Sequence, residues 1–474
     1  MKLRTASLLV VLILLAACSP AQVQLSDTPA AHQLSGWLAA FDSGDKTTFQ
    51  TFLLKNYPAR AGDIDRAMGF RDQTGGFDLK KAEDCAATKC SAIVQERNSE
   101  QFGRIVVEVD AAEPHAIKSI ELRPIPRPAE FPIARMTEAE ALKAFRIYLD
   151  GAAAADRFSG AALVAKNGKP VFTATYGMAD RNKKIPNQLG TQFRIGSMNK
   201  MFTATAVLQL VQAGKINLND PLGKYLTDYP NKDVASKVTI HHLLTHTGGT
   251  GDFFGPEFDK HRMELRTLQD YVKLYGERGL AFEPGSRWEY SNYGFLLLGL
   301  IVQKAGGQDY YDYVREHIFK PAGMTSTDSL PEEQAVPGRS VGYTKMNGTK
   351  EWSSNVNTLP YRGTSAGGGY STVEDLLAFA NALENHKLLD AKFVDLLTTG
   401  KVEARAGAKY GYGFDDEISA DGVRCFGHGG GAPGMNGDLK ICPQSGYVIA
   451  VLANLDPMVA GHASDFITGR LPKD

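Results

Sequence analysis

The chain has 474 residues, of which 43% are hydrophobic and 22% charged, a composition typical of globular proteins. Lysine and arginine number 52 and aspartate and glutamate 53, so the formal net charge is -1, and there is no electrostatic basis for binding nucleic acid or an anionic surface. One hydrophobic core rarely organises this many residues, so we expect two domains after an N-terminal targeting segment.

The first residues have the pattern of an export signal. Two basic residues precede an apolar run at 8–15, and the run ends in Leu-Ala-Ala-Cys at Cys18. Such a run is too short to act as a spanning helix once processed, so we predict a lipoprotein signal peptide at 1–17.

Leu-Ala-Ala-Cys resembles a bacterial lipobox, whose cysteine becomes the lipid-modified first residue of the mature protein. We expect Cys18 to carry this lipid and 18–29 to form a tether, so that the exported protein is anchored to a membrane and faces the periplasm. Ser19 is the residue type that permits transfer to the outer membrane in Gram-negative bacteria. The alternative is ordinary cleavage into the periplasm, with Cys18 removed or unmodified.

The sequence pattern at 30–123 predicts a small α+β domain. A helical pattern at 34–41 precedes strand-like runs at 92–95, 104–109 and 117–122. This order faintly resembles the cone-shaped NTF2-like or cystatin-like domains, and the sequence leaves open whether the domain packs, shapes the substrate site or dimerises.

The cysteines agree with export. Besides Cys18 there are four, an even number that suits disulfides in an oxidising compartment. Cys85 and Cys90 bracket a short turn, and Cys425 and Cys442 flank a predicted hairpin. We predict these two disulfides, with four free buried thiols as the alternative.

The proline-rich segment 124–135 is expected to be a semi-rigid linker, and 136–474 form the larger domain. Strand patterns occur at both ends of this domain and helical patterns in its middle. The expected elements are a helix at 137–155, a hairpin of 160–166 and 171–177, strands near 410–414, 423–426, 439–442 and 447–453, and a helix at 461–471.

Ser197 and Lys200 form a Ser-x-x-Lys pattern before an apolar run at 201–211 that reads as a buried helix. Residues three apart share a helix face, so the lysine amine would lie beside the serine hydroxyl. That hydroxyl needs a base to become a nucleophile, and a desolvated lysine can be one. The alternative is a serine that only caps the helix, because the same spacing recurs at Ser43 and Lys46.

Tyr290 and Asn292 belong to a loop that leads into an apolar helix at 295–303. A phenol near Lys200 could shuttle the proton of the serine to a leaving group, and the amide could orient a substrate or hold the lysine. The alternative is a turn packed under a helix cap. The nearby strand-turn-helix serine favours the functional interpretation.

Two further patterns are weaker. Gly-Thr-Ser-Ala-Gly at 363–367 fits a nucleophile elbow, but no apolar strand precedes it at 357–362. His241, His242 and His246 lack the companion ligands of a metal site, which favours a structural role. With no phosphate-binding fingerprint either, we predict neither a metal nor a cofactor.

Ser-x-x-Lys and Tyr-Ser-Asn together resemble the serine β-lactamase and penicillin-binding protein superfamily, in its branch of class C β-lactamases, esterases and D-alanyl-D-alanine carboxypeptidases. The similarity spans about 159–471. It rests on six segments at family-like spacing: 193–197, 243–249, 283–285, 290–292, 318–324 and 367–372. The implied fold class is α+β: an antiparallel sheet flanked by helices, with an inserted helical lobe, preceded by the small α+β domain.

The resemblance also implies roles. Ser197 would be acylated, with Lys200 as its partner, Tyr290 as general base and Asn292 orienting the substrate. The implied reaction is acyl transfer to the serine followed by hydrolysis.

The third family element, usually Lys-Thr-Gly on a strand beside the cleft, matches His428, Gly429 and Gly430. The backbone N–H of Gly431 would join that of the serine in an oxyanion hole. Histidine is largely neutral at pH 7, which weakens recognition of a substrate carboxylate, and many esterases and peptidases of the family have it here. His-Thr-Gly at 246–248 resembles a separate structural turn of the family and is left out of the site.

We therefore predict a serine hydrolase that cleaves esters or D-amino-acid peptide amides through an acyl-enzyme on Ser197. A β-lactamase or D-Ala-D-Ala carboxypeptidase is the alternative, and a penicillin-binding sensor or scaffold is the non-enzymatic one. The expected partners are a small-molecule or peptide substrate and a membrane reached through the lipid anchor, and no protein partner is assigned.

Overall fold

The computed structural model describes residues 23–346, 351–405 and 408–473. The signal peptide and lipidated Cys18 predicted above lie outside the described residues. The chain divides into two compact units, one ending at Pro124 and one beginning at Ile125.

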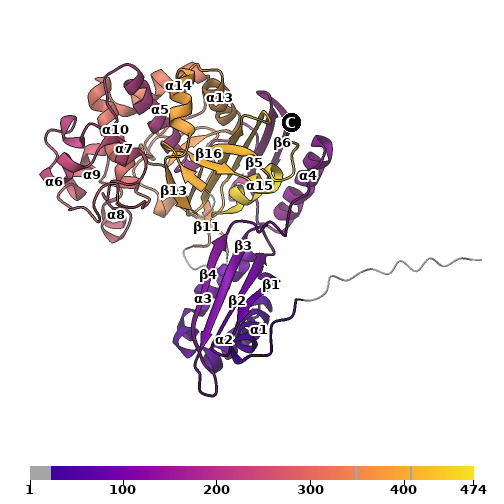
Figure 1. Cartoon of the computed structure of the whole chain (residues 1–474). Helices are drawn as coiled ribbons and strands as arrows, with labels where there is room; N and C mark the ends of the chain where they lie inside the picture. The colour runs from indigo at the N-terminus through magenta and orange to yellow at the C-terminus, as the bar shows by residue number, and fades with distance from the viewer. Residues whose placement is uncertain (1–22, 347–350, 406–407, 474) are drawn as a thin grey trace, which may run out of the picture. The chain divides into compact units, whose positions relative to one another are not determined.

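The N-terminal unit is the small α+β module expected from the sequence, with helices beside one four-stranded antiparallel sheet (Figure 1). The strand order is β1-β2-β3-β4. Its elements are α1 (Pro29–Asp42), α2 (Lys46–Asn56), the 3-10 turn η1 (Pro58–Asp63), α3 (Ile64–Thr74), β1 (Phe77–Cys85), β2 (Lys89–Glu96), β3 (Phe102–Val109) and β4 (Ile117–Ile125). β1 was not predicted, because its many charged residues hide the alternation of a half-buried strand.

The larger unit contains an eight-stranded antiparallel sheet whose order is β13-β14-β15-β16-β17-β18-β5-β6. Its strands are β5 (Gly160–Lys166), β6 (Lys169–Tyr176), β13 (Val402–Arg405), β14 (Ala408–Tyr410), β15 (Asp415–Ile418), β16 (Arg424–Ala432), β17 (Met435–Cys442) and β18 (Tyr447–Ala453). Two strands from the start of the unit thus join six from its end. The sequence predicted that both ends would supply strands, but it indicated only four of them at the end of the chain.

Helices cover both faces of this sheet (Figure 1). On one face, α4 (Glu138–Ala154) and α15 (Val459–Thr468) share a hydrophobic cluster with the strands. The other face packs against the helical lobe. The lobe and its flanking helices are α5 (Asn199–Gln212), η2 (Leu222–Lys224), α6 (Lys232–Lys237), α7 (Ile240–Leu244), α8 (Pro256–His261), α9 (Leu268–Tyr275), α10 (Asn292–Gly306), α11 (Tyr310–Val314), the π turn η3 (Arg315–Phe319), α12 (Lys320–Ala322), η4 (Val356–Thr358), α13 (Val373–Glu384) and α14 (Ala391–Thr398).

Short strands complete the unit. They are β7 (Met178–Asp180), β8 (Ile185–Pro186), β9 (Phe193–Gly196), β10 (Tyr343–Thr344), β11 (Ser353–Ser354) and β12 (Gly369–Ser371). β9 pairs with β12 in an antiparallel register that places Gly196 opposite Gly369. This α+β architecture is the one implied by the family resemblance, which the structure confirms.

The strand predicted at 410–414 is wrong. β14 ends at Tyr410, the chain turns, and Gly413 adopts a positive φ of 72° before β15 begins at Asp415. Such a φ departs from regular extended backbone, and glycine reaches it at low cost.

Both predicted disulfides are present. Cys85 is bonded to Cys90 across β1 and β2, and Cys425 to Cys442 across β16 and β17. The paired cysteines suit an extracytoplasmic protein. Among the helices of the described ranges, none is both long and apolar enough to cross a membrane.

Candidate active site

Ser197 lies in the turn between β9 and α5. The N-cap of α5 is Met198, and no side chain caps the helix, so the serine hydroxyl is not used as a cap. Gly196 has a φ of 51°, which lets the chain reverse just before the serine. The half-buried serine is thus held at the start of a buried helix, where partial positive charge favours an anion.

Lys200 is completely buried and has three hydrogen-bond partners. Its Nζ lies 3.3 Å from Oγ of Ser197, 2.7 Å from Oδ1 of Asn292 and 2.6 Å from the carbonyl oxygen of Ala366. Burial lowers the pKa of Lys200 to about 7, and the charge of Asp252 opposes that shift. Near neutral pH a large fraction of this amine is therefore uncharged.

The partners of Lys200 determine where its lone pair points. A neutral amine has two N–H donors and one lone pair. The oxygens of Asn292 and Ala366 can only accept, so they take both N–H groups. The lone pair then faces the hydroxyl of Ser197, which is the arrangement of a base beside its nucleophile.

Tyr290 and Asn292 lie beside this lysine. Ser291 caps α10, which begins at Asn292 rather than at the predicted residue 295. The ring centroid of Tyr290 is 4.7 Å from Nζ of Lys200. The structure thus brings Tyr290, Asn292, Lys200 and Ser197 together, although they come from two separate segments of the chain.

His428 lies on β16, and 5% of its surface is exposed. Its Nδ1 contacts the carbonyl oxygen of Gly429, and its Nε2 is 3.0 Å from the hydroxyl of Tyr410. The rings of His428 and Tyr290 are 6.4 Å apart, which places the predicted third element in the same site. Tyr410 was not predicted, because it belongs to no motif and precedes the histidine by 18 residues.

Gly430 and Gly431 pass very close to the serine turn. A β-carbon added to Gly430 would lie 1.9 Å from the carbonyl oxygen of Ile195 and 3.0 Å from the amide nitrogen of Ser197. One added to Gly196 would lie 2.8 Å from the amide nitrogen of Gly431. Only glycine allows this close approach of the segment of Gly430 and Gly431 to the serine turn.

His246, which the sequence analysis left out, is part of the site's wall. It is fully buried, and its ring lies 4.3 Å from that of Tyr290 and 4.7 Å from that of Tyr410. The backbone N–H of Ser291 donates to its Nδ1 at 3.1 Å, so the proton of the neutral ring is on Nε2. Burial holds the pKa of His246 well below its usual value, and the ring stays neutral.

Asp252 was also not identified from the sequence as part of the site. Its Oδ2 accepts a hydrogen bond of 2.8 Å from the amide nitrogen of Asn292. The two residues are 40 positions apart and belong to no shared motif. No spacing in the sequence indicated this contact.

The rival patterns do not form sites. Ser365, the serine of the elbow-like segment, is fully buried, and its hydroxyl contacts the carbonyl oxygen of Leu296. His241 shares a hydrogen bond of 2.8 Å with the hydroxyl of Tyr412. Across the described parts of the chain, no cluster of three or more His, Cys, Asp or Glu could hold a metal ion.

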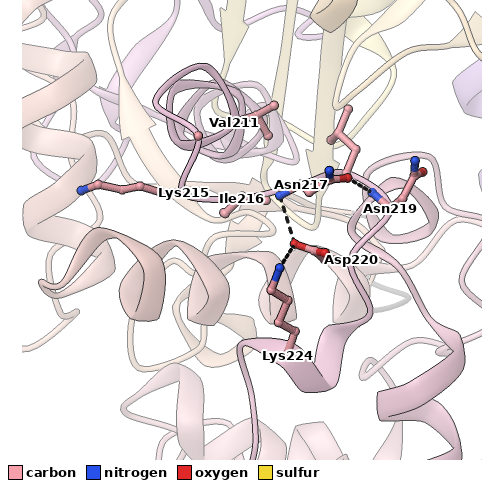
Figure 2. Close-up of a pocket in the computed structure, with 9 residues that line it drawn as sticks. Val211, Lys215, Ile216, Asn217, Asn219, Asp220 and Lys224 are labelled. Carbon is pink, nitrogen blue, oxygen red and sulfur yellow. Dashed lines mark hydrogen bonds and ion pairs between the residues drawn. The ribbon is translucent and has the colours of Figure 1, made fainter.

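A pocket of about 430 Å³ lies elsewhere, near the C-terminal end of α5 (Figure 2). Asp220 in this pocket accepts hydrogen bonds from the backbone N–H of Asn217 and from Lys224. The 14 residues of α5 span roughly 20 Å and separate the pocket from Ser197. This pocket is therefore not the catalytic site.

Comparisons with known proteins show the family of the chain. A family model described as Beta-lactamase matches residues 145–471. The Bacillus subtilis (strain 168) protein PbpX, named as a penicillin-binding protein, is 33% identical over 297 residues, which cover 62% of this chain and 70% of PbpX.

Two solved structures are similar in fold and in sequence. A penicillin binding protein from Bacillus halodurans has 34% identity and a TM-score of 0.61, covering 68% of this chain and 98% of that one. A D-stereospecific amidohydrolase from Streptomyces sp. has 29% identity and a TM-score of 0.58, covering 70% and 97%. With the family model matching more than half of its residues, the chain belongs to the Beta-lactamase family of serine hydrolases.

Proposed function

We propose that this protein hydrolyses carboxylic esters or D-amino-acid amides through an acyl-enzyme on Ser197. The observation that carries the proposal is the buried amine of Lys200, whose two carbonyl partners direct its lone pair at the serine hydroxyl. A lysine with a pKa of about 7 suits general base catalysis near neutral pH.

In the acylation step, Oγ of Ser197 bonds to the substrate carbonyl carbon and its proton passes to Nζ of Lys200. The negative charge that develops on the carbonyl oxygen is stabilised by the backbone N–H groups of Ser197 and Gly431. The bond to the leaving group then breaks, and the leaving group takes the proton. In this proposal Lys200 is the base for Ser197, and Tyr290, for which the resemblance implied the role of general base, relays the proton between Lys200 and the leaving group. Water gives a proton to Tyr290 and attacks the carbonyl carbon of the acyl-enzyme. The bond from that carbon to Oγ of Ser197 then breaks, Oγ takes the proton back, and the acid is released.

The choice of substrate rests on His428. A neutral histidine in place of the family's usual lysine favours esters and amides over substrates that present a carboxylate beside the scissile bond. The similar Streptomyces protein, a D-stereospecific amidohydrolase, supports a D-configured amide. A β-lactam is the second candidate, supported by the two similar proteins that are named as penicillin-binding.

We further propose that the protein works outside the cytoplasm, attached to a membrane through a lipid on Cys18. The paired cysteines and the lipobox-like sequence support this location. The anchor would keep a hydrolase near substrates of the cell envelope.

The test is time-resolved intact-mass analysis of the chain from Ser19 onward, mixed separately with an activated ester, a D-amino-acid amide and a penicillin. We expect an adduct that forms and decays with the ester and the amide, and no adduct in Ser197→Ala. A lasting penicillin adduct would instead indicate a penicillin-binding sensor or a transpeptidase-like protein, and no adduct and no product with any reagent would reject the enzyme.

A further inference from the structure

We propose that Asp252 is a positioning residue that holds the side-chain amide of Asn292 with its oxygen, and not its nitrogen, toward Lys200. The inference rests on the proposed function, in which Lys200 is the base. It assigns a role to a residue outside the three family motifs.

The carboxylate of Asp252 is itself held on both oxygens. Oδ2 accepts from the amide nitrogen of Asn292 at 2.8 Å, and Oδ1 accepts from the backbone N–H groups of Phe253 at 2.6 Å and Phe254 at 3.4 Å. Nη1 of Arg278 donates to its backbone carbonyl oxygen at 2.6 Å. These contacts leave the carboxylate little freedom to turn away from the amide.

Hydrogen-bond polarity then sets the orientation of the amide. A carboxylate only accepts, so the NH₂ end of Asn292 must face Asp252 and its oxygen must face Lys200. That oxygen takes one N–H of the neutral amine, and the carbonyl oxygen of Ala366 takes the other. If the amide turned by 180°, its N–H would point at the amine and compete with Ser197 for the lone pair.

Asp252 also places a negative charge near Lys200 without touching it. Four other groups face the lysine: the aromatic rings of Tyr290 and Phe295, the hydroxyl of Ser197, and the nearby buried, neutral ring of His246. His428 lies one ring farther away, next to Tyr290. The Asp252 charge favours the ammonium form of the amine. Loss of that charge should make the lysine deprotonate at lower pH.

The test compares Asp252→Asn, Asp252→Ala and the control Asp259→Asn, which removes an exposed carboxylate of the same segment. Asp252→Asn keeps one acceptor oxygen for the two places that the carboxylate serves, so it holds the amide of Asn292 less firmly, and we expect the maximal acylation rate to fall less than in Asp252→Ala. The acidic limb of the kcat/KM profile for p-nitrophenyl acetate should move to lower pH, because the ammonium form of Lys200 loses a nearby negative charge. Asp259→Asn should leave the limb in place.

In Asp252→Ala the amide loses its anchor, and we expect kcat to fall at least tenfold with KM changed less than twofold. Thermal unfolding of each variant shows whether a lower kcat comes from loss of the fold. If the alanine variant does not fold, the pH profile of the near-isosteric Asp252→Asn still tests the proposal. The proposal would be overturned if both variants had the acidic limb of the kcat/KM profile at the wild-type pH and reacted at wild-type rates.

An NMR titration of ¹⁵N-labelled lysine follows the same shift without turnover. This experiment separates the role of Asp252 from the proposed function. If no substrate acylates the wild-type protein, the proposed function fails, but the lysine resonance still shows whether Asp252 governs the titration of Lys200. An Nζ titration midpoint that is identical in wild-type protein and Asp252→Asn would contradict the role of Asp252 in either case.

Discussion

The hydroxyl of Tyr410 and Nε2 of His428 lie 3.0 Å apart, while Nδ1 of the same imidazole contacts the carbonyl oxygen of Gly429. A carbonyl oxygen only accepts, so Nδ1 carries a proton, and Nε2 shares a hydrogen bond with the hydroxyl of Tyr410. Both ring nitrogens thus have partners within the protein. The site therefore has a hydrogen-bonded histidine where the family usually has a lysine.

We expect His428→Lys to change the substrate preference. The introduced charge should raise kcat/KM for a D-peptide with a free carboxylate about tenfold relative to the matching amide, because the carboxylate gains an ionic partner. Steady-state kinetics on the two peptides measure this ratio, with Tyr410→Phe as the control that keeps the ring neutral. An unchanged ratio in His428→Lys would show that His428 does not face the leaving-group side.

The acylation rate should depend on the ionisation of Lys200. Because burial lowers its pKa to about 7, the amine gains a proton below that pH and can no longer accept one from Ser197. We expect kcat/KM to fall about tenfold per pH unit below pH 7 and to level off above it. Stopped-flow acylation from pH 5 to 9 tests this.

Lys200→Arg is the companion variant. Arginine remains charged at every accessible pH, so we expect at least a thousandfold loss of acylation. Lys215→Arg, at an exposed position, should react like wild type. A Lys200→Arg protein with substantial activity would mean that another group is the base.

Gly430→Ala should abolish the site. Its new methyl group would lie 1.9 Å from the carbonyl oxygen of Ile195, so β9 and β16 must separate and the Ser197 and Gly431 amides move apart. We expect at least a hundredfold loss of acylation. Gly461→Ala in α15 meets no atom within 4 Å and serves as the control. Equal rates in the two variants would contradict the role of the close approach.

Removal of the Cys425–Cys442 disulfide should destabilise the larger unit. The bond closes a loop with a sequence separation of 17, for which chain entropy gives about 3 kcal/mol. Urea unfolding of the double serine variant measures the loss. The disulfide between Cys85 and Cys90 closes a shorter loop in the other unit. Its removal by the matched double serine variant should leave acylation unchanged. An unchanged urea midpoint in the double variant of Cys425 and Cys442 would contradict the prediction.

Cys18→Ala should prevent lipid attachment. In a Gram-negative host fed labelled palmitate, we expect label on the wild-type protein and none on the variant, which should leave the membrane fraction. Cys85→Ser is the control and should retain the label. Label that persists in Cys18→Ala, or is absent from wild type, rules out the anchor.

Sequence alone predicted the parts of the site that depend on local rules. Ser197 and Lys200 are three residues apart at the start of a helix, so helix geometry by itself brings their side chains together. The two disulfides were likewise predicted, because an even number of cysteines placed around a short turn and a hairpin is typical of an oxidising compartment. Gly430 and Gly431 were indicated only by the family resemblance. The prediction of a strand at 410–414 was wrong, because a turn at Gly413 interrupts an otherwise strand-like run.

The tertiary structure decided the rest. Lys200 meets Asn292 across 92 residues, Asn292 meets Asp252 across 40, and His428 meets Tyr410 across 18. No periodicity links positions on separate elements, so only the packing of helices within the lobe and the order of strands within the sheet bring them together. That packing also excludes water from Lys200, and this burial, which the sequence does not contain locally, is what lowers the lysine's pKa.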